Sequence, residues 1–249
     1  MEVVGRSLPE TYHKALDALM RHGKDVMCYD YNEMTTELPM TMVITHPFEE
    51  PMISKIFPGG HGDLQQYIME ICDGIFDFKV GDGDTAWEYT YHQRMIKDNQ
   101  IDFVINELKK NPNSRRAVID VRDNEIDQNT THPACLQHIQ FMIRKNKLEM
   151  YVTMRSNDAF RAAFMNAIGF IFLQKKIADE LGVEVGRYEH RANSFHVYEK
   201  NFEAFGKAVN RIRTEAHCDL VYNYEDFYKE LMEEEVPNIL AKVKEIKGK

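Results

Sequence analysis

The stretch LQHIQFMIRKNKLEMYVTM, residues 136–154, decides the fold class because it holds two strand-like runs separated by a polar turn. Residues 136–143 and 148–154 contain β-branched, aromatic and long apolar side chains, and RKNK lies between them. Two such runs joined by a short polar segment predict a β-hairpin. The charges of its turn are expected to be solvated.

Helical patterns precede this hairpin. Apolar residues recur at helical spacing from Tyr12 to Leu19, after a segment SLPE that predicts a capping box at Ser7 and before a stop at Gly23. A second apolar face covers residues 64–71, where Asp63 is expected to cap the helix. A third helix fits QIDFVINELKK, residues 100–110.

The pattern continues on both sides of these elements. Residues 164–181 are apolar almost all round at their start, which predicts a helix buried on most sides and ending at Gly182. Strands are predicted at 40–44, 115–121 and 191–198, a helix from about 199 to 212, and a tail that is helical on both sides of Pro237. Since there is no repeat, low-complexity segment or linker, we predict one α+β domain spanning residues 1–249.

Composition excludes several classes of protein. The 31 Lys and Arg against 40 Asp and Glu give a formal charge of -9, which argues against a nucleic-acid binder that depends on neutralising phosphates. No apolar run reaches transmembrane length and the N-terminus lacks a secretory pattern, so we expect a cytoplasmic protein with no membrane partner. The four cysteines form no CxxC pair, so we expect them to be reduced.

Three short motifs suggest a phosphate or metal site and have simpler explanations. FPGGHGD, residues 57–63, has neither the GxGxxG nor the P-loop spacing and predicts a turn. VGDGDT, residues 80–85, lacks the remaining ligands of a calcium loop and also predicts a turn. Cys135 and His138 lie three apart in a strand-like segment, so their side chains are expected on opposite faces. No metal site is predicted.

Polar side chains occur where apolar ones are expected, and these positions are the candidates for a functional site. Each has an ordinary explanation when taken alone: Cys135 as a small buried apolar residue, Asn166 as a hydrogen-bonded core amide, His196 as a core histidine with satisfied bonds. The candidates are Glu70, Tyr89, Arg115, Arg116, Cys135, Arg155, Ser156, Asp158, Asn166, His196 and Tyr198.

Together these positions resemble the thymidylate synthase family, which includes the pyrimidine nucleotide hydroxymethylases. The matching stretches are NSRRAV, PACLQHIQF, MRSNDAF, the helix that contains Asn166, and FHVY. As in the family, Arg115 precedes Cys135 by twenty positions and Arg155 follows it by twenty. Asn166 lies eight positions beyond the motif aspartate, and the histidine of FHVY lies thirty beyond Asn166. The sequence is most similar to the short archaeal and phage-like members.

Two upstream positions extend the resemblance. YTYHQR resembles the segment that carries a catalytic tyrosine, which falls on Tyr89, and Glu70 lies where the family keeps an essential glutamate. The resemblance implies a large mixed β-sheet packed by helices and a homodimer formed through that sheet.

The resemblance also implies a substrate and a set of binding residues. A pyrimidine nucleoside monophosphate would be held at its phosphate by Arg155 and Ser156 of one subunit and by Arg115 and Arg116 of the other. His196 and Tyr198, which alternate on one strand face, would bond the sugar hydroxyl. Asp158 is expected to contact both the nucleotide and the folate.

The implied chemistry is one-carbon transfer to C5 of the base. The thiolate of Cys135 adds to C6 of dUMP, and Arg155 is expected to raise the thiolate fraction. Asn166 would pair with O4 and N3–H of uracil, and Glu70 and Tyr89 would move protons through ordered water. The carbon comes from 5,10-methylenetetrahydrofolate or a related reduced pterin; hydride then gives dTMP, and water gives 5-hydroxymethyl-dUMP.

Departures from the family pattern leave alternatives open. There is no N-terminal RTG phosphate loop, for which Lys24 is the one possible replacement, and Phe164–Met165 stand where a Pro-Phe pair usually precedes the asparagine. The segment KEIKGK replaces the short apolar tail that closes over the cofactor in bacterial and eukaryotic members. The alternatives are a hydroxymethylase acting on dUMP, dCMP or CMP, an inactive nucleotide-binding member, and a structural protein in which Cys135 only packs.

Overall fold

The computed structural model describes residues 1–81 and 86–248, and within them a seven-stranded mixed sheet forms the centre of the fold. The strand order is β1-β3-β8-β7-β6-β5, with β2 also paired to β3. These strands are β1 (Glu2–Gly5), β2 (Lys24–Cys28), β3 (Glu33–Ile44), β5 (Val118–Asp120), β6 (Leu136–Arg144), β7 (Lys147–Asp158) and β8 (Glu184–Tyr198). β1 runs parallel to β3 and β7 to β8, whereas the other neighbours are antiparallel. The predicted α+β fold with a large mixed sheet is confirmed.

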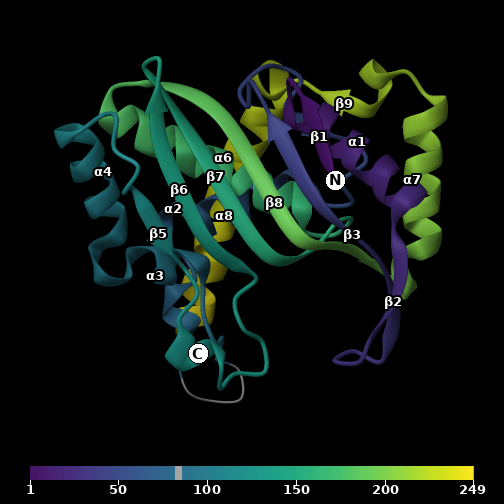
Figure 1. Cartoon of the computed structure of the whole chain (residues 1–249), viewed down its shortest axis with the longest axis horizontal. Helices are drawn as coiled ribbons and strands as arrows, with labels where there is room; N and C mark the ends of the chain where they lie inside the picture. The colour runs from purple at the N-terminus through teal and green to yellow at the C-terminus, as the bar shows by residue number, and fades with distance from the viewer. Residues whose placement is uncertain (82–85, 249) are drawn as a thin grey trace.

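Helices pack behind and beside this sheet (Figure 1). α6 contacts β7 and β8, α2 packs on α6, and α8 packs on α2, whereas α1 contacts β3 and α7. β4 (Ile53–Ser54) and β9 (Val221–Tyr222) form a separate pair. The helices are α1 (Leu8–His22), α2 (His61–Asp73), α3 (Tyr91–Ile96), α4 (Gln100–Lys110), α5 (Asn124–Asp127), α6 (Ala163–Leu181), α7 (Phe202–Thr214) and α8 (Lys229–Lys247).

The predicted hairpin is confirmed by β6 and β7, which pair from Leu136 with Met154 to Arg144 with Lys147. Lys145 and Asn146 form the two-residue turn with φ of 52° and 61°, the positive values that match the twist of the flanking strands. Along β7 every second residue from Leu148 to Met154 is buried. The hairpin therefore presents one apolar face to the helices and one more polar face away from them.

α6 is the central helix, and it is buried on most sides as predicted. Two buried polar side chains interrupt its apolar surface, Asn166 and Gln174. Gln174 Nε2 donates to the carbonyls of Leu148, at 2.7 Å, and Arg187, at 3.1 Å, which ties the helix to β7 and β8. Gly182 ends the helix with a left-handed φ of 68°. These contacts fix the position of Asn166 relative to the carboxyl ends of β7 and β8.

Several predicted details are wrong at the ends of elements. The Ser7 side chain makes no capping bond, because the Glu10 carboxylate accepts from the backbone N–H of Arg6, at 2.7 Å, instead. Asp63 is not the cap of α2 but its third residue, where it accepts from Gly60 N at 2.8 Å. β8 begins seven residues before the predicted strand, because its pairing with β7 extends to Lys147 opposite Glu184. The strand predicted at residues 115–121 is shorter than expected and covers Val118–Asp120.

Two kinds of feature are absent from residues 1–81 and 86–248. No helix there is long and apolar enough to cross a membrane. No group of three or more His, Cys, Asp or Glu side chains in the same residues could hold a metal ion. Most of the turn predicted at residues 80–85 lies outside the described residues, because these exclude 82–85.

Candidate active site

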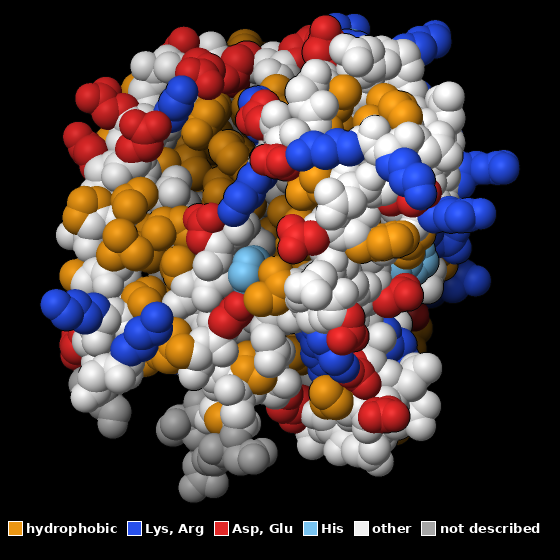
Figure 2. Space-filling model, turned by 90° about the vertical axis from the view of Figure 1, so that its left-hand side faces the viewer, with side chains coloured by type: hydrophobic (Ala, Val, Ile, Leu, Met, Phe, Trp, Pro, Cys, Tyr) orange, Lys and Arg blue, Asp and Glu red, His pale blue; other side chains and the backbone are white. Residues whose placement is uncertain are grey.

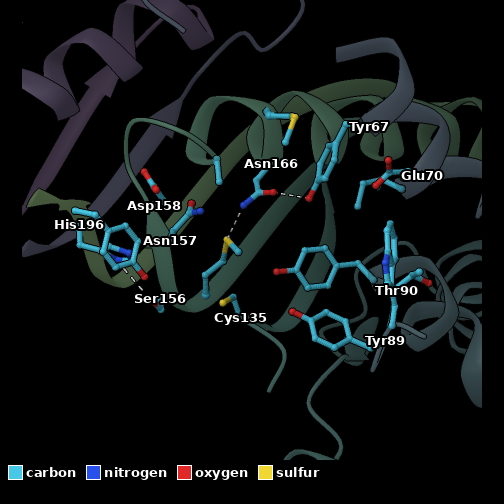
Figure 3. A pocket seen from close by; sticks show the side chains of 17 residues that line it. Tyr67, Glu70, Tyr89, Thr90, Cys135, Ser156, Asn157, Asp158, Asn166 and His196 are labelled. Atoms are coloured by element: carbon cyan, nitrogen blue, oxygen red, sulfur yellow. Dashed lines mark hydrogen bonds between the residues drawn. The ribbon is translucent and has the colours of Figure 1, made fainter. Parts of the chain in front are cut away.

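A cavity of about 430 Å³ lies where β7 and β8 end against α2 and α6 (Figure 3). Because β7 and β8 are parallel, their carboxyl ends meet at the same edge and bring their last side chains together. Eight of the predicted site residues line this cavity: Glu70, Tyr89, Cys135, Ser156, Asp158, Asn166, His196 and Tyr198. Residues spread over more than a hundred positions of sequence thus meet in one place.

Cys135 lies directly before β6, where the pairing register with β7 is irregular. Arg155 holds the preceding loop: its Nη2 donates to Pro133 O at 2.7 Å and its Nε to Ala134 O at 3.2 Å. Burial raises the pKa of the Cys135 thiol, and the nearby Arg155 guanidinium offsets only part of this rise. The expectation that Arg155 makes the thiol more acidic is therefore correct in sign but outweighed by burial.

Three tyrosines, from α2 and from residues at or just before the start of α3, line the cavity that contains the thiol. Tyr89 and Tyr91 have ring centroids 5.5 Å apart, and both line the cavity with Tyr67. Burial raises the pKa of Tyr89, while hydrogen bonds with Tyr91 and with the Cys135 backbone partly oppose the rise. The phenol therefore keeps its proton near neutral pH and can donate it to a bound group.

Glu70 lies on α2 at the opposite end of the cavity from His196 (Figure 3). Burial raises the pKa of its carboxyl group, and the hydrogen bond from Gln66 Nε2 to Oε1, at 2.8 Å, partly offsets the rise. The positive charges of Lys242 and Lys79 also oppose this rise, but the net effect is a raised pKa. A carboxyl group with a raised pKa can exchange a proton more readily near neutral pH.

His196 and Tyr198 occupy one face of β8 and both point into the cavity. Their rings meet edge to face with centroids 4.7 Å apart. His196 Nδ1 lies 3.4 Å from Ser194 Oγ and 3.5 Å from Ser156 Oγ, which are long distances for hydrogen bonds. The imidazole is therefore buried but loosely bonded.

Asp158 connects the cavity to the start of α6. Its Oδ1 accepts from Phe160 N at 3.0 Å and from Arg161 N at 2.8 Å. These bonds fix the turn that aims α6, and with it Asn166, at the cavity. Asp158 thus has a structural task in this chain besides its place in the lining.

The predicted arginines do not line the cavity. Arg155 is exposed and bonds the loop before Cys135, and Arg115 and Arg116 are exposed in the segment between α4 and β5. Within residues 1–81 and 86–248, neither Arg115 nor Arg116 forms an ion pair. The described lining of the cavity includes no lysine or arginine.

Tyr67 and Asn157 are among the lining residues that the sequence analysis missed. Tyr67 was counted as part of the apolar face of α2, yet its hydroxyl donates to Asn166 Oδ1. Its position three residues before Glu70, on the same helix face, was the available signal. Asn157, inside the motif MRSNDAF, has its Oδ1 2.8 Å from His190 Nε2 and lies against the cavity floor.

A second cavity of about 900 Å³ lies between α2, α3, α4 and α6. On the face shown in Figure 2, hydrophobic side chains gather in a hollow bordered by charged ones. The larger cavity is lined by Cys72, His92, Ile105, Lys109, Ile177 and others, and includes none of the predicted site residues. The smaller cavity is therefore the candidate active site on the basis of its chemistry and not its size.

Comparisons with known proteins agree on one family. The pattern of the thymidylate synthase family matches residues 63–239. A "putative thymidylate synthase" of Methanocaldococcus jannaschii is 33% identical over 215 residues, which cover 81% of this chain and 92% of that protein. A deoxyuridylate hydroxymethyltransferase of Pseudomonas phage M6 is 29% identical over 214 residues, covering 79% of this chain and 60% of the phage protein. The solved structure of thermostable thymidylate synthase A from Bacillus subtilis shares the fold, with a TM-score of 0.67 at 17% identity over 87% of this chain and 95% of that one.

Proposed function

We propose a reaction for this chain from one premise: it belongs to the thymidylate synthase family, whose members transfer a one-carbon unit to C5 of a pyrimidine nucleotide. The proposed reaction converts dUMP to dTMP through a covalent bond between Cys135 and C6, with residues 1–249 acting as one catalytic domain. The observation that carries it is the meeting of Cys135, Asn166, Glu70 and His196 in one cavity.

The first step is addition of Cys135 to the base. C6 of uracil is the β-position of an enone, so a sulfur–C6 bond moves the C5–C6 electron pair toward C5 and O4. Because burial raises the pKa of Cys135, the thiol is protonated in the free protein and must transfer its proton as the sulfur–C6 bond forms; the enolate at C5 and O4 is the group that can take it up. Tyr89 lies beside the thiol. The phosphate of the substrate brings negative charge, which arginine side chains must balance.

Asn166 reads the base in this proposal. Its amide projects from α6 over the cavity that contains Cys135 (Figure 3). Nδ2 can donate to O4 and Oδ1 can accept from N3–H of uracil. A base with the reverse pattern leaves buried polar groups unpaired, which discriminates strongly.

Proton transfer is assigned to Glu70 and Tyr89. The C5 hydrogen must leave as a proton after the carbon–carbon bond forms, and the departing amine must be protonated. Glu70 has a raised pKa and can accept and return a proton through water. Tyr89 lies close to Cys135 and can donate to, or orient, such a water.

The reduced pterin is assigned to the part of the cavity nearer Glu70. Trp87, Ile71 and Met165 are among the residues that line the cavity and provide flat or apolar surfaces for a fused ring system. Methylenetetrahydrofolate, or a related reduced pterin, would supply the carbon and the hydride when bound. Asp158 is proposed to contact both this group and the nucleotide, because it lines the cavity between the two strands and α6.

We further propose a homodimer formed through the exposed face of the sheet, because the site needs positive charge that its own described lining does not provide. Arg115 and Arg116 of a second copy would supply it, together with Arg155 and Ser156 of the first. To test this, Cys135→Ala protein is mixed with the Arg115→Ala/Arg116→Ala double variant. An equilibrated equimolar mixture is expected to recover up to about a quarter of the wild-type activity, because about half of its dimers are mixed and each mixed dimer has one complete site of two. Native mass spectrometry verifies that mixed dimers form. Verified mixed dimers without activity would contradict the shared site.

A second candidate product is favoured by one comparison. The phage relative at 29% identity is a deoxyuridylate hydroxymethyltransferase. That name is compatible with the same covalent chemistry ending in addition of water. The outcome depends on how well the site excludes solvent at the last step.

Mass spectrometry of the product tests the proposal. The protein is incubated with methylenetetrahydrofolate and, in parallel, dUMP, dCMP, UMP or CMP. We expect a methyl product from dUMP together with dihydrofolate. A hydroxymethyl product with tetrahydrofolate would establish the second candidate, and no product from any nucleotide would contradict both.

A further inference from the structure

Tyr67 connects two helices across the candidate active site. It lies on α2, and its hydroxyl donates to Oδ1 of Asn166 on α6 (Figure 3). Burial raises the pKa of Tyr67 well above its ordinary value, and nearby Glu70 adds to the rise. The hydroxyl therefore keeps its proton and acts as a donor to the amide oxygen.

The α6 surface is shaped to receive the tyrosine ring. Gly169 lies three residues after Asn166, and a Cβ atom at that position would lie 2.8 Å from Cδ1 of Tyr67 and 3.1 Å from Cγ1 of Ile71. Such contacts are too short for any residue larger than glycine without movement of the ring. The ring is thus held by close packing at Gly169, and its hydroxyl is held by the bond to Asn166.

A complete account of the Asn166 amide shows what remains for a ligand. A carboxamide has two acceptor positions on Oδ1 and two donor hydrogens on Nδ2. Tyr67 occupies one acceptor position, and Nδ2 contacts Met154 Sδ at 3.9 Å with one hydrogen. One acceptor position on Oδ1 and one donor hydrogen on Nδ2 are left.

Tyr67 and Met154 also determine the orientation of the Asn166 amide, that is, which side carries Oδ1 and which side carries Nδ2. Rotating the amide by half a turn would place Oδ1 against Met154 Sδ, and a thioether has no proton to donate. It would also leave the Tyr67 hydroxyl hydrogen without its acceptor, since the phenol oxygen could then only accept from Nδ2. The observed orientation is therefore preferred, because the turned amide leaves both Oδ1 and the hydroxyl hydrogen unpaired.

We propose that Tyr67 is a positioning residue that fixes the orientation of the Asn166 amide and thereby sets which pyrimidine the cavity accepts. The proposal rests on the function proposed above. Uracil presents the N3–H donor beside the O4 acceptor, whereas cytosine presents the N3 acceptor beside the amino donor. An amide that cannot turn matches one of these edges and leaves unpaired groups against the other.

Dissociation constants of dUMP and dCMP, measured by calorimetry, test this inference. Tyr67→Phe removes one hydroxyl and keeps the ring. We expect its preference for dUMP over dCMP to fall about tenfold, mostly through weaker dUMP binding, because one net hydrogen bond to the amide is lost. The matched control is Tyr12→Phe, since the Tyr12 hydroxyl donates to Phe160 O at 3.3 Å and does not line the cavity. This control should keep the wild-type ratio.

Failure of the inference and failure of the proposed function give different results. Wild-type protein that prefers dUMP, together with an unchanged ratio in Tyr67→Phe, would overturn only the role of Tyr67. Wild-type protein that binds neither nucleotide would overturn both.

Two further measurements test the inference, the first without that variant and the second without substrate. Gly169→Ala leaves the Tyr67 hydroxyl intact but forces the ring away. Like Tyr67→Phe, it should reduce the preference for dUMP over dCMP. In the free protein, NMR relaxation of the Asn166 side-chain amide should show restricted rotation about the Cβ–Cγ bond, and Tyr67→Phe should increase this motion. Equal order parameters in the two proteins would overturn the proposal.

Discussion

Two histidines of β8, six positions apart, show opposite ways of using a buried imidazole. His190 is bonded at both nitrogens, to Tyr188 Oη and to Asn157 Oδ1, each at 2.8 Å. Burial lowers its pKa to about 3, so it is neutral at physiological pH. His196 is nearly as buried, but its contacts to the hydroxyls of Ser156 and Ser194 are 3.5 and 3.4 Å.

The difference separates groups that stabilise the fold from groups available to a ligand. A buried polar atom with complete, short bonds gains little from a new partner, whereas one with long contacts can improve its bonding when a ligand arrives. Asn157 links the two environments, because it bonds His190 and also lines the cavity that His196 faces. The floor of the site is thus rigid, and its inner surface is left incompletely bonded.

The largest expected effect is on catalysis, and it extends the comparison to two cysteines, one in the candidate active site and one outside it. Cys135→Ala should lower kcat by at least about 10⁴-fold, because loss of the nucleophile removes a covalent route that no neighbour replaces. Cys72→Ala is the matched control, since Cys72 lines the second cavity and burial raises its pKa to about 12. Steady-state kinetics on both variants would show the contrast; comparable losses would mean that Cys135 is only a packing residue.

A second effect concerns stability and pH at His190. The unfolded histidine binds a proton below its ordinary pKa of 6.5, and the folded one does so only near 3, so stability is lost as the pH falls through this window. Between pH 7 and pH 5 this group should remove about 2 kcal/mol of unfolding free energy. Urea denaturation at the two pH values should show a smaller loss in His190→Gln. His13, whose pKa is also lowered to about 3, is unchanged in both proteins and cancels.

The smallest effect is expected at His196. His196→Ala should weaken dUMP binding about tenfold, because a hydrogen bond to the sugar 3'-hydroxyl is lost. 2',3'-Dideoxyuridine monophosphate lacks that hydroxyl and should bind equally to wild type and variant. Calorimetric titration of both ligands would make this comparison. Equal weakening for the two ligands would show that His196 shapes the site without contacting the sugar.

The sequence predicted the centre of this molecule better than its edges. The β6–β7 hairpin and α6 follow from strong local patterns, and the spacing of polar residues around Cys135 is enough to indicate the family. The short strands β1 and β2 were missed because their stability comes from pairing with β3, a contact that local patterns do not reveal. The cap of α2 was misplaced, and Ser7, although it is the N-cap of α1, lacks the predicted side-chain bond.

Within the site, residue types were easier to predict than their environments. The sequence indicated Arg155 as a neighbour of Cys135, but the balance between its charge and burial depends on packing. Tyr67 looked like an ordinary apolar-face residue, and its bond to Asn166 depends on how closely α2 approaches α6 at Gly169. Side-chain partners across two helices are not encoded in either helix alone.

The most direct test of the central claim is exchange of the C5 hydrogen of dUMP in D₂O, followed by proton NMR. If Cys135 adds to C6, C5 gains electron density and takes up a deuteron from solvent; when the thiol is eliminated, the original C5 proton leaves and the deuteron stays. The account predicts loss of the H5 signal with wild-type protein and its retention with Cys135→Ala. Retention of H5 with wild type, or equal loss with both proteins, would contradict it.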